Sequence, residues 1–123
     1  MPYTEVLFYQ EADEVVPLVD WLETLPAKVR DKCLVKLERL EELGYELRRP
    51  EADYLRDDIY ELRVRFQHLN YRMLYFFYGK TAAVVSHGCT KEHEVPASEI
   101  ESAIEHKKKV MTNPRRHLFR PEE

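Results

Sequence analysis

The 123-residue sequence has few cysteines, only three glycines and no long apolar run. Its two cysteines, Cys33 and Cys89, are too few for a disulfide framework, so we expect reduced thiols. No segment approaches the ~20 apolar residues that a membrane-spanning helix needs, and the first residues lack the basic and apolar blocks of a signal peptide. These absences predict a cytoplasmic protein without a membrane association, and they argue against a disulfide-rich secreted scaffold.

What the sequence has is enough apolar material for one packed domain, with 44% hydrophobic and 34% charged residues. Its periodicity predicts the order β-α-α-β-β-β-α, an α+β fold with helices packed on one face of an antiparallel sheet. The predicted strands cover residues 3–9, 59–67, 71–78 and 81–89, and the predicted helices begin at Pro17 and Pro26 and span 96–110. We expect one domain over residues 1–111, with an irregular connection at 45–58 and a basic, mobile tail at 112–123.

Charge is distributed unevenly along the chain, although the net charge is only −4. Residues 1–58 have 15 acidic and 8 basic side chains, whereas residues 59–91 have 1 acidic and 5 basic side chains. Residues 106–120 have 6 basic and no acidic side chains. Because salt screens exposed charges over roughly 8 Å, local sign matters more than the total. The strands and the tail are therefore candidate polyanion-binding regions; the alternative is an ordinary solvated surface.

Arginines stand on two predicted strands where a purely structural sheet does not need them. In segment 59–67, apolar side chains alternate with Glu61, Arg63 and Arg65, so one face is expected to be buried and the other to carry guanidinium groups. Arg72 begins an otherwise apolar face of the next strand. Guanidinium groups bind phosphate bidentately and stay charged, which favours a nucleic-acid partner. The alternative is ion pairing with Glu61 or with helix carboxylates.

A second group of polar residues, His87, Cys89, Lys91 and His93, gathers at the end of the last predicted strand. It offers too few close ligands for a structural zinc site, and a bare H-x-C does not define a cysteine nucleophile. Acid–base chemistry or phosphate contact by His87 or Lys91 fits better, and the alternative is a histidine satisfied at the sheet edge. Tyr71 is a candidate for stacking on a base.

Four segments, taken in order, resemble the RelE/HigB toxin superfamily, and most closely its HigB-like, phage-associated branch. They are L-R-D-D-I-Y-E-L-R at 55–63, Y-R-M-L-Y-F at 71–76, V-V-S-H-G-C-T-K at 84–91, and a helix that opens at Pro96 and contains Glu99, Ile100 and Ala103. The resemblance covers roughly residues 3–111 and implies a RelE-like fold. It also implies the toxin of a type II toxin–antitoxin pair, typically a ribosome-dependent mRNA endoribonuclease that needs no metal or other cofactor.

The resemblance also implies roles for individual residues in the attack of a ribose 2′-hydroxyl on the adjacent phosphate. Arg63 and Arg72 match the arginines of the family's E-L-R and Y-R strands, which implies that they hold phosphate and stabilise transition-state charge. His87 and Lys91 match its H-G-x-x-K stretch, which implies proton transfer or positioning for His87 and charge neutralisation or proton transfer for Lys91. The further residues that we expect to contact RNA are Arg65, Tyr71 and His93.

The implied partners are the ribosome with its mRNA and a cognate antitoxin, typically of the helix-turn-helix type, through which alone the toxin would reach operator DNA. Two positions depart from the family pattern: Cys89 stands where phenylalanine is common, and Glu92 where a second lysine often follows. Two alternatives stay open. One is a same-fold toxin or regulatory module without nuclease activity, directed at gyrase or bound to an antitoxin; the other is a general RNA-binding protein.

Overall fold

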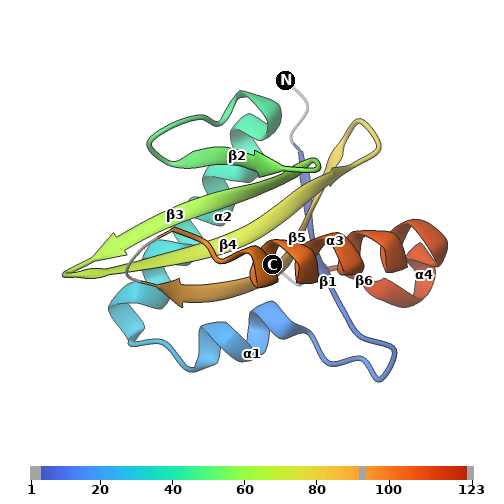
Figure 1. Cartoon of the computed structure of the whole chain (residues 1–123), viewed down its shortest axis with the longest axis horizontal. Helices are drawn as coiled ribbons and strands as arrows, with labels where there is room; N and C mark the ends of the chain where they lie inside the picture. The colour runs from blue at the N-terminus through green and yellow to red at the C-terminus, as the bar shows by residue number, and fades with distance from the viewer. Residues whose placement is uncertain (1–3, 92–93, 122–123) are drawn as a thin grey trace.

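The computed structural model describes residues 4–91 and 94–121 and shows a six-stranded sheet with helices on both faces (Figure 1). The strands are β1 (Glu5–Tyr9), β2 (Ala52–Arg56), β3 (Ile59–Phe66), β4 (Leu69–Tyr78), β5 (Ala82–Lys91) and β6 (Leu118–Phe119). The helical segments are α1 (Pro17–Glu23), α2 (Ala27–Leu43), the short 3-10 helix η1 (Gly44–Glu46), α3 (Ala97–Thr112) and α4 (Pro114–His117). The strand order is β2-β3-β4-β5-β1-β6, which confirms the predicted α+β class and is consistent with a RelE-like fold.

The centre of the sheet is the antiparallel run β3-β4-β5, and β1 joins β5 in parallel. The prediction missed β2, which lies inside the segment expected to be irregular. Asp57 and Asp58 form the two-residue turn between β2 and β3, with φ angles of 53° and 64°. Aspartate tolerates positive φ, and two-residue hairpin turns require it at both positions. The D-D pair was therefore a usable hairpin signal.

Helices cover both faces of the sheet, so the expectation of helices on one face is wrong. Helices α1 and α2 pack against the face that carries Leu62 and Met73, and α3 packs against the face that carries Leu74 and Phe76. The reason lies in β4, where consecutive residues from Met73 to Phe76 are all buried. A strand that is apolar on both sides must be covered on both sides.

Helix α2 buries one apolar stripe, as its spacing predicted. The buried residues are Val29, Cys33, Leu37 and Leu40. Burial raises the pKa of the Cys33 thiol to about 11, which keeps it protonated and unreactive. The helix ends at Gly44, whose φ of 53° and close contact with the Thr4 side chain leave no room for a Cβ atom.

Residues 114–119 of the C-terminal segment are folded onto the sheet as α4 and β6, whereas the sequence led us to expect a mobile tail at 112–123. Asn113 caps α4 through its side chain, and β6 pairs with β1 in antiparallel register, Phe8 opposite Phe119. His117 is buried and its ring stacks on Tyr9 at a centroid distance of 5.6 Å. The tail was misjudged because its anchors are contacts with the first strand, far away in the sequence.

Candidate functional site

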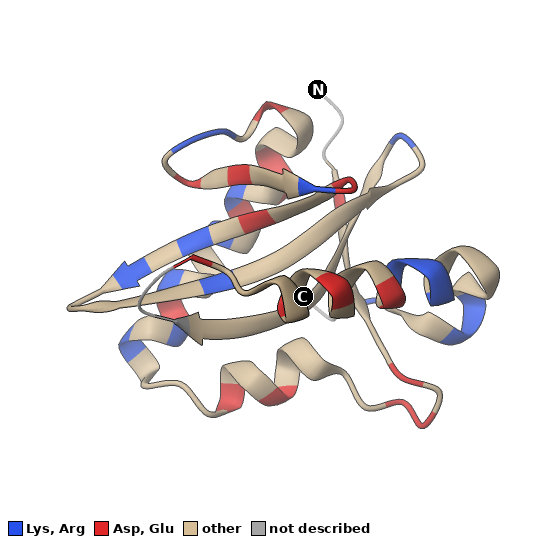
Figure 2. Cartoon of the chain, viewed as in Figure 1, with Lys and Arg blue, Asp and Glu red and all other residues tan. Residues whose placement is uncertain are grey.

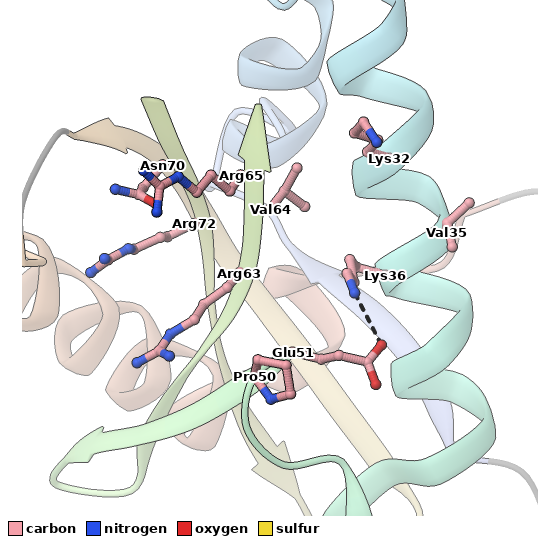
Figure 3. Close-up of a pocket in the computed structure, with 10 residues that line it drawn as sticks. All are labelled: Lys32, Val35, Lys36, Pro50, Glu51, Arg63, Val64, Arg65, Asn70 and Arg72. Carbon is pink, nitrogen blue, oxygen red and sulfur yellow. Dashed lines mark hydrogen bonds and ion pairs between the residues drawn. The ribbon is translucent and has the colours of Figure 1, made fainter. Parts of the chain in front are cut away.

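The main hollow of the molecule lies at the edge of β3, where β2 stops short of the end of its neighbour. The register of β2 against β3 runs from Arg56 opposite Ile59 to Ala52 opposite Leu62, so the last residues of β3 extend past β2. The hollow has a volume of about 780 Å³ and wraps around this edge between α2 and the two strands (Figure 3). It is lined by Lys32, Val35, Lys36, Pro50, Glu51, Arg63, Val64, Arg65, Asn70 and Arg72. We call it the β3-edge groove.

Two of the predicted arginines lie side by side in this groove. Arg63 on β3 is directly opposite Arg72 on β4 in the antiparallel register. Figure 3 shows both side chains extending to the same side of the sheet, away from α2. The Arg63 side chain is 37% exposed and that of Arg72 14% exposed, so Arg63 is the more accessible of the pair. The sheet register therefore brings together two permanent positive charges that are separated in sequence.

A buried carboxylate lies between these two arginines. Glu61 is 1% exposed, and its Oε2 accepts a hydrogen bond from Arg63 Nε at 2.9 Å. Its Oε1 is 3.3 Å from Arg72 Nη1, an ion pair without hydrogen-bond geometry. The buried Arg72 Nε has no hydrogen-bond partner among residues 4–91 and 94–121. Arg72 therefore keeps a buried donor unsatisfied, which is a cost to the folded state.

A second carboxylate reaches the pair from β2. Asp53 lies opposite Glu61 in the register, and its Oδ2 accepts hydrogen bonds from Arg49 Nε at 3.0 Å and Arg63 Nη2 at 3.1 Å. The hydrogen bond from Arg49 is the main cause that holds the pKa of Asp53 below its usual value. Ion pairing was the alternative considered for the strand arginines, and the structure shows it for Arg63 and Arg72.

The groove is nonetheless predominantly basic. Its lining contains five basic side chains and one carboxylate, Glu51. Hydrogen bonds from Arg39 and Lys36 lower the pKa of Glu51 to about 2, so this residue stays ionised and neutralises part of their charge. Arg65 and Lys32 are exposed at the other end of the hollow. Even with the buried Glu61 and the partly exposed Asp53 counted, basic groups outnumber acidic ones around the groove.

His87 lies on the same face of the sheet as Arg72 but outside the groove lining. A bulge in β5 places Ser86 and His87 under α3. His87 Nε2 is 2.9 Å from Glu99 Oε1, and its Nδ1 is 2.7 Å from Ser86 Oγ. The same hydroxyl is 2.7 Å from Nδ1 of His106, whose pKa is lowered to about 4, first by burial and then by the neighbouring His87. Both ring nitrogens of His87 are thus engaged, which corresponds to the alternative of a satisfied histidine.

Tyr71 is a core residue, and its assignment to RNA stacking is wrong. It is 6% exposed and lies on the face covered by α1, with its ring 6.5 Å from that of Trp21. Trp21 also lies flat enough on β5 that a Cβ atom on Gly88 would collide with its indole ring. The alternation in β4 decides this: Arg72 faces the groove side, so its neighbour Tyr71 must face the opposite side.

The remaining predicted residues lie where the strand β5 ends. The backbone of Lys91 pairs with Asn70, a groove residue, while its side chain, Glu92 and His93 lie outside the described residues. Cys89 is buried opposite Arg72. In residues 4–91 and 94–121, no cluster of three or more His, Cys, Asp or Glu side chains has a metal-binding arrangement.

Sequence reasoning missed the side of the groove formed by α2. Lys32 and Lys36 are one turn apart on α2 and flank the buried stripe of Val29, Cys33 and Leu37. Their spacing was visible in the sequence. What was not visible is that this turn of α2 lies beside the end of β3.

A sequence profile of the family "Phage derived protein Gp49-like (DUF891)" matches residues 20–108. The chain belongs to this family. Its members are RelE-like, toxin-like proteins, which supports the broad resemblance without selecting the HigB branch. The match ends before the folded C-terminal segment and includes β2 to β5 and the whole groove. No curated protein sequence matched the chain. In the described part of this Gp49-like protein, no helix is long and apolar enough to cross a bilayer.

Proposed function

We propose that this Gp49-like protein is the toxin of a type II toxin–antitoxin pair and cleaves mRNA on the ribosome. The proposal rests on one observation: Arg63 and Arg72 lie side by side at the rim of a basic groove. The partners implied by the resemblance, a cognate antitoxin and the ribosome with mRNA, belong to the same proposal. The family match is compatible with the toxin assignment.

The groove chemistry suits a ribose-phosphate chain. The two guanidinium groups offer several donors toward one side of the sheet, where phosphate oxygens accept charge-assisted hydrogen bonds. The Arg63 side chain is 37% exposed and that of Arg72 14%, so an incoming phosphate would meet Arg63 first. Lys32 and Lys36 lie around the edge of β3, where neighbouring phosphates of an extended strand would pass. The buried Glu61 keeps the arginines aligned before RNA arrives.

The proposed reaction is an in-line displacement at phosphorus. The ribose 2′-oxygen forms a bond to the phosphorus, and the bond from phosphorus to the 5′-oxygen of the next nucleotide breaks. Negative charge that builds on the phosphoryl oxygens is stabilised by Arg63 and Arg72, which need no reorganisation because they are held in place. The 2′-hydroxyl loses a proton and the leaving oxygen gains one, a role that the resemblance gives to Lys91. Glu51 cannot supply a base of useful strength because its pKa is about 2.

A second candidate is a toxin or regulatory module of the same fold that binds a protein target and cuts no RNA. It is favoured by the carboxylates at the arginines: Glu61 and Asp53 form ion pairs with Arg63 at 2.9 and 3.1 Å, and Glu61 with Arg72 at 3.3 Å. These pairs reduce the positive potential that RNA would meet. The two candidates are distinguished by whether cellular mRNA is cut or stays intact when the protein is expressed.

The test maps mRNA 5′ ends after brief expression of three forms: the natural chain, the double variant Glu61→Gln/Arg72→Gln, and the control Arg48→Gln. The double variant replaces the buried ion pair with two neutral amides. Glutamine has the shape of Glu61 but is shorter than Arg72, so the variant leaves no unpaired charge buried but removes the guanidinium group. Arg48 is exposed on the connection before β2 and does not line the β3-edge groove. We expect new mRNA ends with the natural chain and with Arg48→Gln, and none with the double variant.

Two outcomes would overturn the proposal. Growth arrest by the natural chain with intact mRNA would replace it by the second candidate. Cutting by the double variant at the natural rate would remove Arg72 from the reaction, provided that urea unfolding shows both proteins folded.

A further inference from the structure

A second cluster of cations lies at the end of the molecule away from the groove, where α3 meets α4. Figure 2 shows these basic residues at the right of the view and the strand arginines at the left. Lys108, Lys109, Arg115 and Arg116 are all exposed there. We call these four residues the α3–α4 corner.

The corner is built by a backbone clamp between the two ends of the described chain. The side-chain amide of Gln10 donates to the Arg116 carbonyl at 2.9 Å, and the Gln10 backbone N–H donates to the His117 carbonyl at 3.0 Å. Gln10 also accepts, through its carbonyl, at 2.9 Å from His117 Nδ1. Asn113 caps the turn by accepting from the Arg116 N–H at 3.3 Å. These bonds hold the main chain and leave the arginine side chains unused.

The clamp has a rigid base. His117 is buried and stacks on Tyr9, and Tyr9 stacks on His106 of α3 at a centroid distance of 3.9 Å. The Tyr9 hydroxyl donates to Glu11 at 2.7 Å, and its pKa is raised, chiefly by burial. A tail that only needed to be soluble would not require these contacts. Their effect is to hold Arg115 and Arg116 beside the last turn of α3.

The cations of the corner differ in how far they are neutralised. Lys109 Nζ is 3.7 Å from Glu11, and the neighbouring Lys107 Nζ is 3.6 Å from Asp58. Within residues 4–91 and 94–121, no ion pair involves Lys108, Arg115 or Arg116. Glu105 is the one acidic residue that lines the shallow hollow at the corner, together with Lys108, Lys109, Thr112, Asn113 and His117. The corner therefore presents uncompensated positive charge from a fixed backbone.

We infer that the α3–α4 corner is a second, separate binding surface for the sugar–phosphate backbone of RNA. Two adjacent arginines favour phosphate, which a guanidinium binds bidentately. An anionic membrane fits less well because it is an extended plane, which would also meet the exposed Glu101 and Glu105 of α3, whereas a narrow sugar–phosphate chain can contact the four cations alone. The surface binds by charge and carries no sequence information.

This binding surface does not depend on whether the groove cleaves RNA. If both surfaces contact one large RNA, attachment at the corner raises the effective concentration of that RNA at the groove. The corner would then contribute to affinity for a structured RNA, whereas the groove would contribute the chemistry.

The test measures binding of an RNA duplex to the purified full chain over a series of salt concentrations. The corner variant is Lys108→Gln/Arg115→Gln/Arg116→Gln. Its matched control is Lys28→Gln/Arg48→Gln/Lys80→Gln, which removes the same charge from exposed sites elsewhere. Each lost phosphate contact reduces the slope of log K against log salt by about 0.7 to 0.9, so the corner variant is expected to lose about 2 units of slope and at least roughly tenfold in affinity. The control is expected to retain the slope of the natural chain.

Parallel arms separate this inference from its rivals. The Glu61→Gln/Arg72→Gln variant is expected to keep the corner-dependent slope even if it cuts no mRNA, so a failure of the nuclease proposal leaves this result intact. Equal slopes for the corner variant and its control would overturn the inference, since total charge would then explain binding. Loss of binding to phosphatidylserine vesicles with unchanged RNA binding would overturn it in favour of a membrane surface.

Discussion

The β3-edge groove and the α3–α4 corner hold their cations in opposite ways. In the groove, Arg63 and Arg72 are tied to Glu61 and Asp53 within the sheet. At the corner, the backbone is clamped and the arginine heads are exposed. Ion pairs fix the positions of the groove guanidinium groups but neutralise part of their positive potential. The exposed arginines of the corner keep their full positive potential, but their side chains are not held in one position. The first arrangement suits stabilisation of a transition state, and the second suits attraction of a polyanion.

The largest expected effect comes from breaking the ion pair between Arg72 and Glu61 in the groove. Arg72→Ala leaves Glu61 buried with only Arg63 as a charged partner, and removing one member of a buried pair typically costs about 3 kcal/mol or more. We expect that loss in the free energy of unfolding measured with urea, together with loss of mRNA cutting. Glu61→Gln/Arg72→Gln should recover most of the stability and none of the cutting. An Arg72→Ala protein that is inactive but as stable as the natural chain would show that the ion pair of Arg72 with Glu61 does not stabilise the fold.

The next effect concerns His106, which lies in the stack of rings beneath the α3–α4 corner, and it depends on pH. Burial of the His106 ring lowers its pKa from the usual 6.5 to about 4 in the folded protein. The unfolded chain therefore takes up a proton first, so the stabilising contribution is complete above pH 6.5 and is lost as pH falls toward 4. The loss amounts to at most about 3 kcal/mol, at 1.36 kcal/mol for each pKa unit. His106→Gln should flatten the urea-derived stability profile over this window, and an unchanged slope would assign the titration to another group.

The groove should lose stability in a different and more acidic window. The pKa of Glu51 is lowered from 4.5 to about 2 by hydrogen bonds from Arg39 and Lys36. Its contribution is present above pH 4.5 and is lost as pH falls toward 2. Glu51→Gln should therefore remove part of the acid sensitivity below pH 4.5 while leaving the His106 window intact. The urea-derived free energy of unfolding, measured against pH for each variant, would show both windows. An unchanged slope below pH 4.5 in Glu51→Gln would contradict the assignment to Glu51.

The smallest expected change tests whether exposed and tied arginines differ within the groove itself. Arg65 is exposed, so Arg65→Gln should change the free energy of unfolding by less than about 0.5 kcal/mol. It should weaken binding of single-stranded RNA and reduce the salt slope by about 0.7. Calorimetric unfolding and RNA titration on the same preparation give both values. A large stability loss would mean that Arg65 is tied as Arg63 is.

Much of the fold could be predicted, because β3, β4 and β5 show clear alternation and α2 has one apolar stripe. The omissions have local causes. Strand β2 has only five residues and β6 only two, so neither is long enough to show a clear alternation of apolar and polar residues. The placement of helices on both faces could have been derived from the four consecutive buried residues of β4, Met73 to Phe76. The folded C-terminal segment could not, because its anchors are Tyr9 and Gln10.

For the site, the structure places Arg63, Arg65 and Arg72 along one groove, whereas their expected roles in catalysis and RNA binding stay predictions. Ion pairing of Arg63 and Arg72 had been considered only as an alternative. The prediction for Tyr71 was wrong because successive side chains of a strand point to opposite faces, so Tyr71 cannot share a face with Arg72. The roles of His87 and Lys91 in catalysis stay predictions, and the structure places His87 in a network with Ser86 and Glu99.

The sequence by itself determined which residues alternate, which faces are apolar and where permanent positive charge stands on the strands. These are properties of neighbouring residues, set by the two-residue period of a strand and the 3.6-residue period of a helix. Only the tertiary structure decided that Arg63 lies opposite Arg72, that Glu61 lies between them, and that β2 stops early enough to leave a groove. Register and strand length across a sheet depend on partners distant in sequence, and local periodicity carries no information about them.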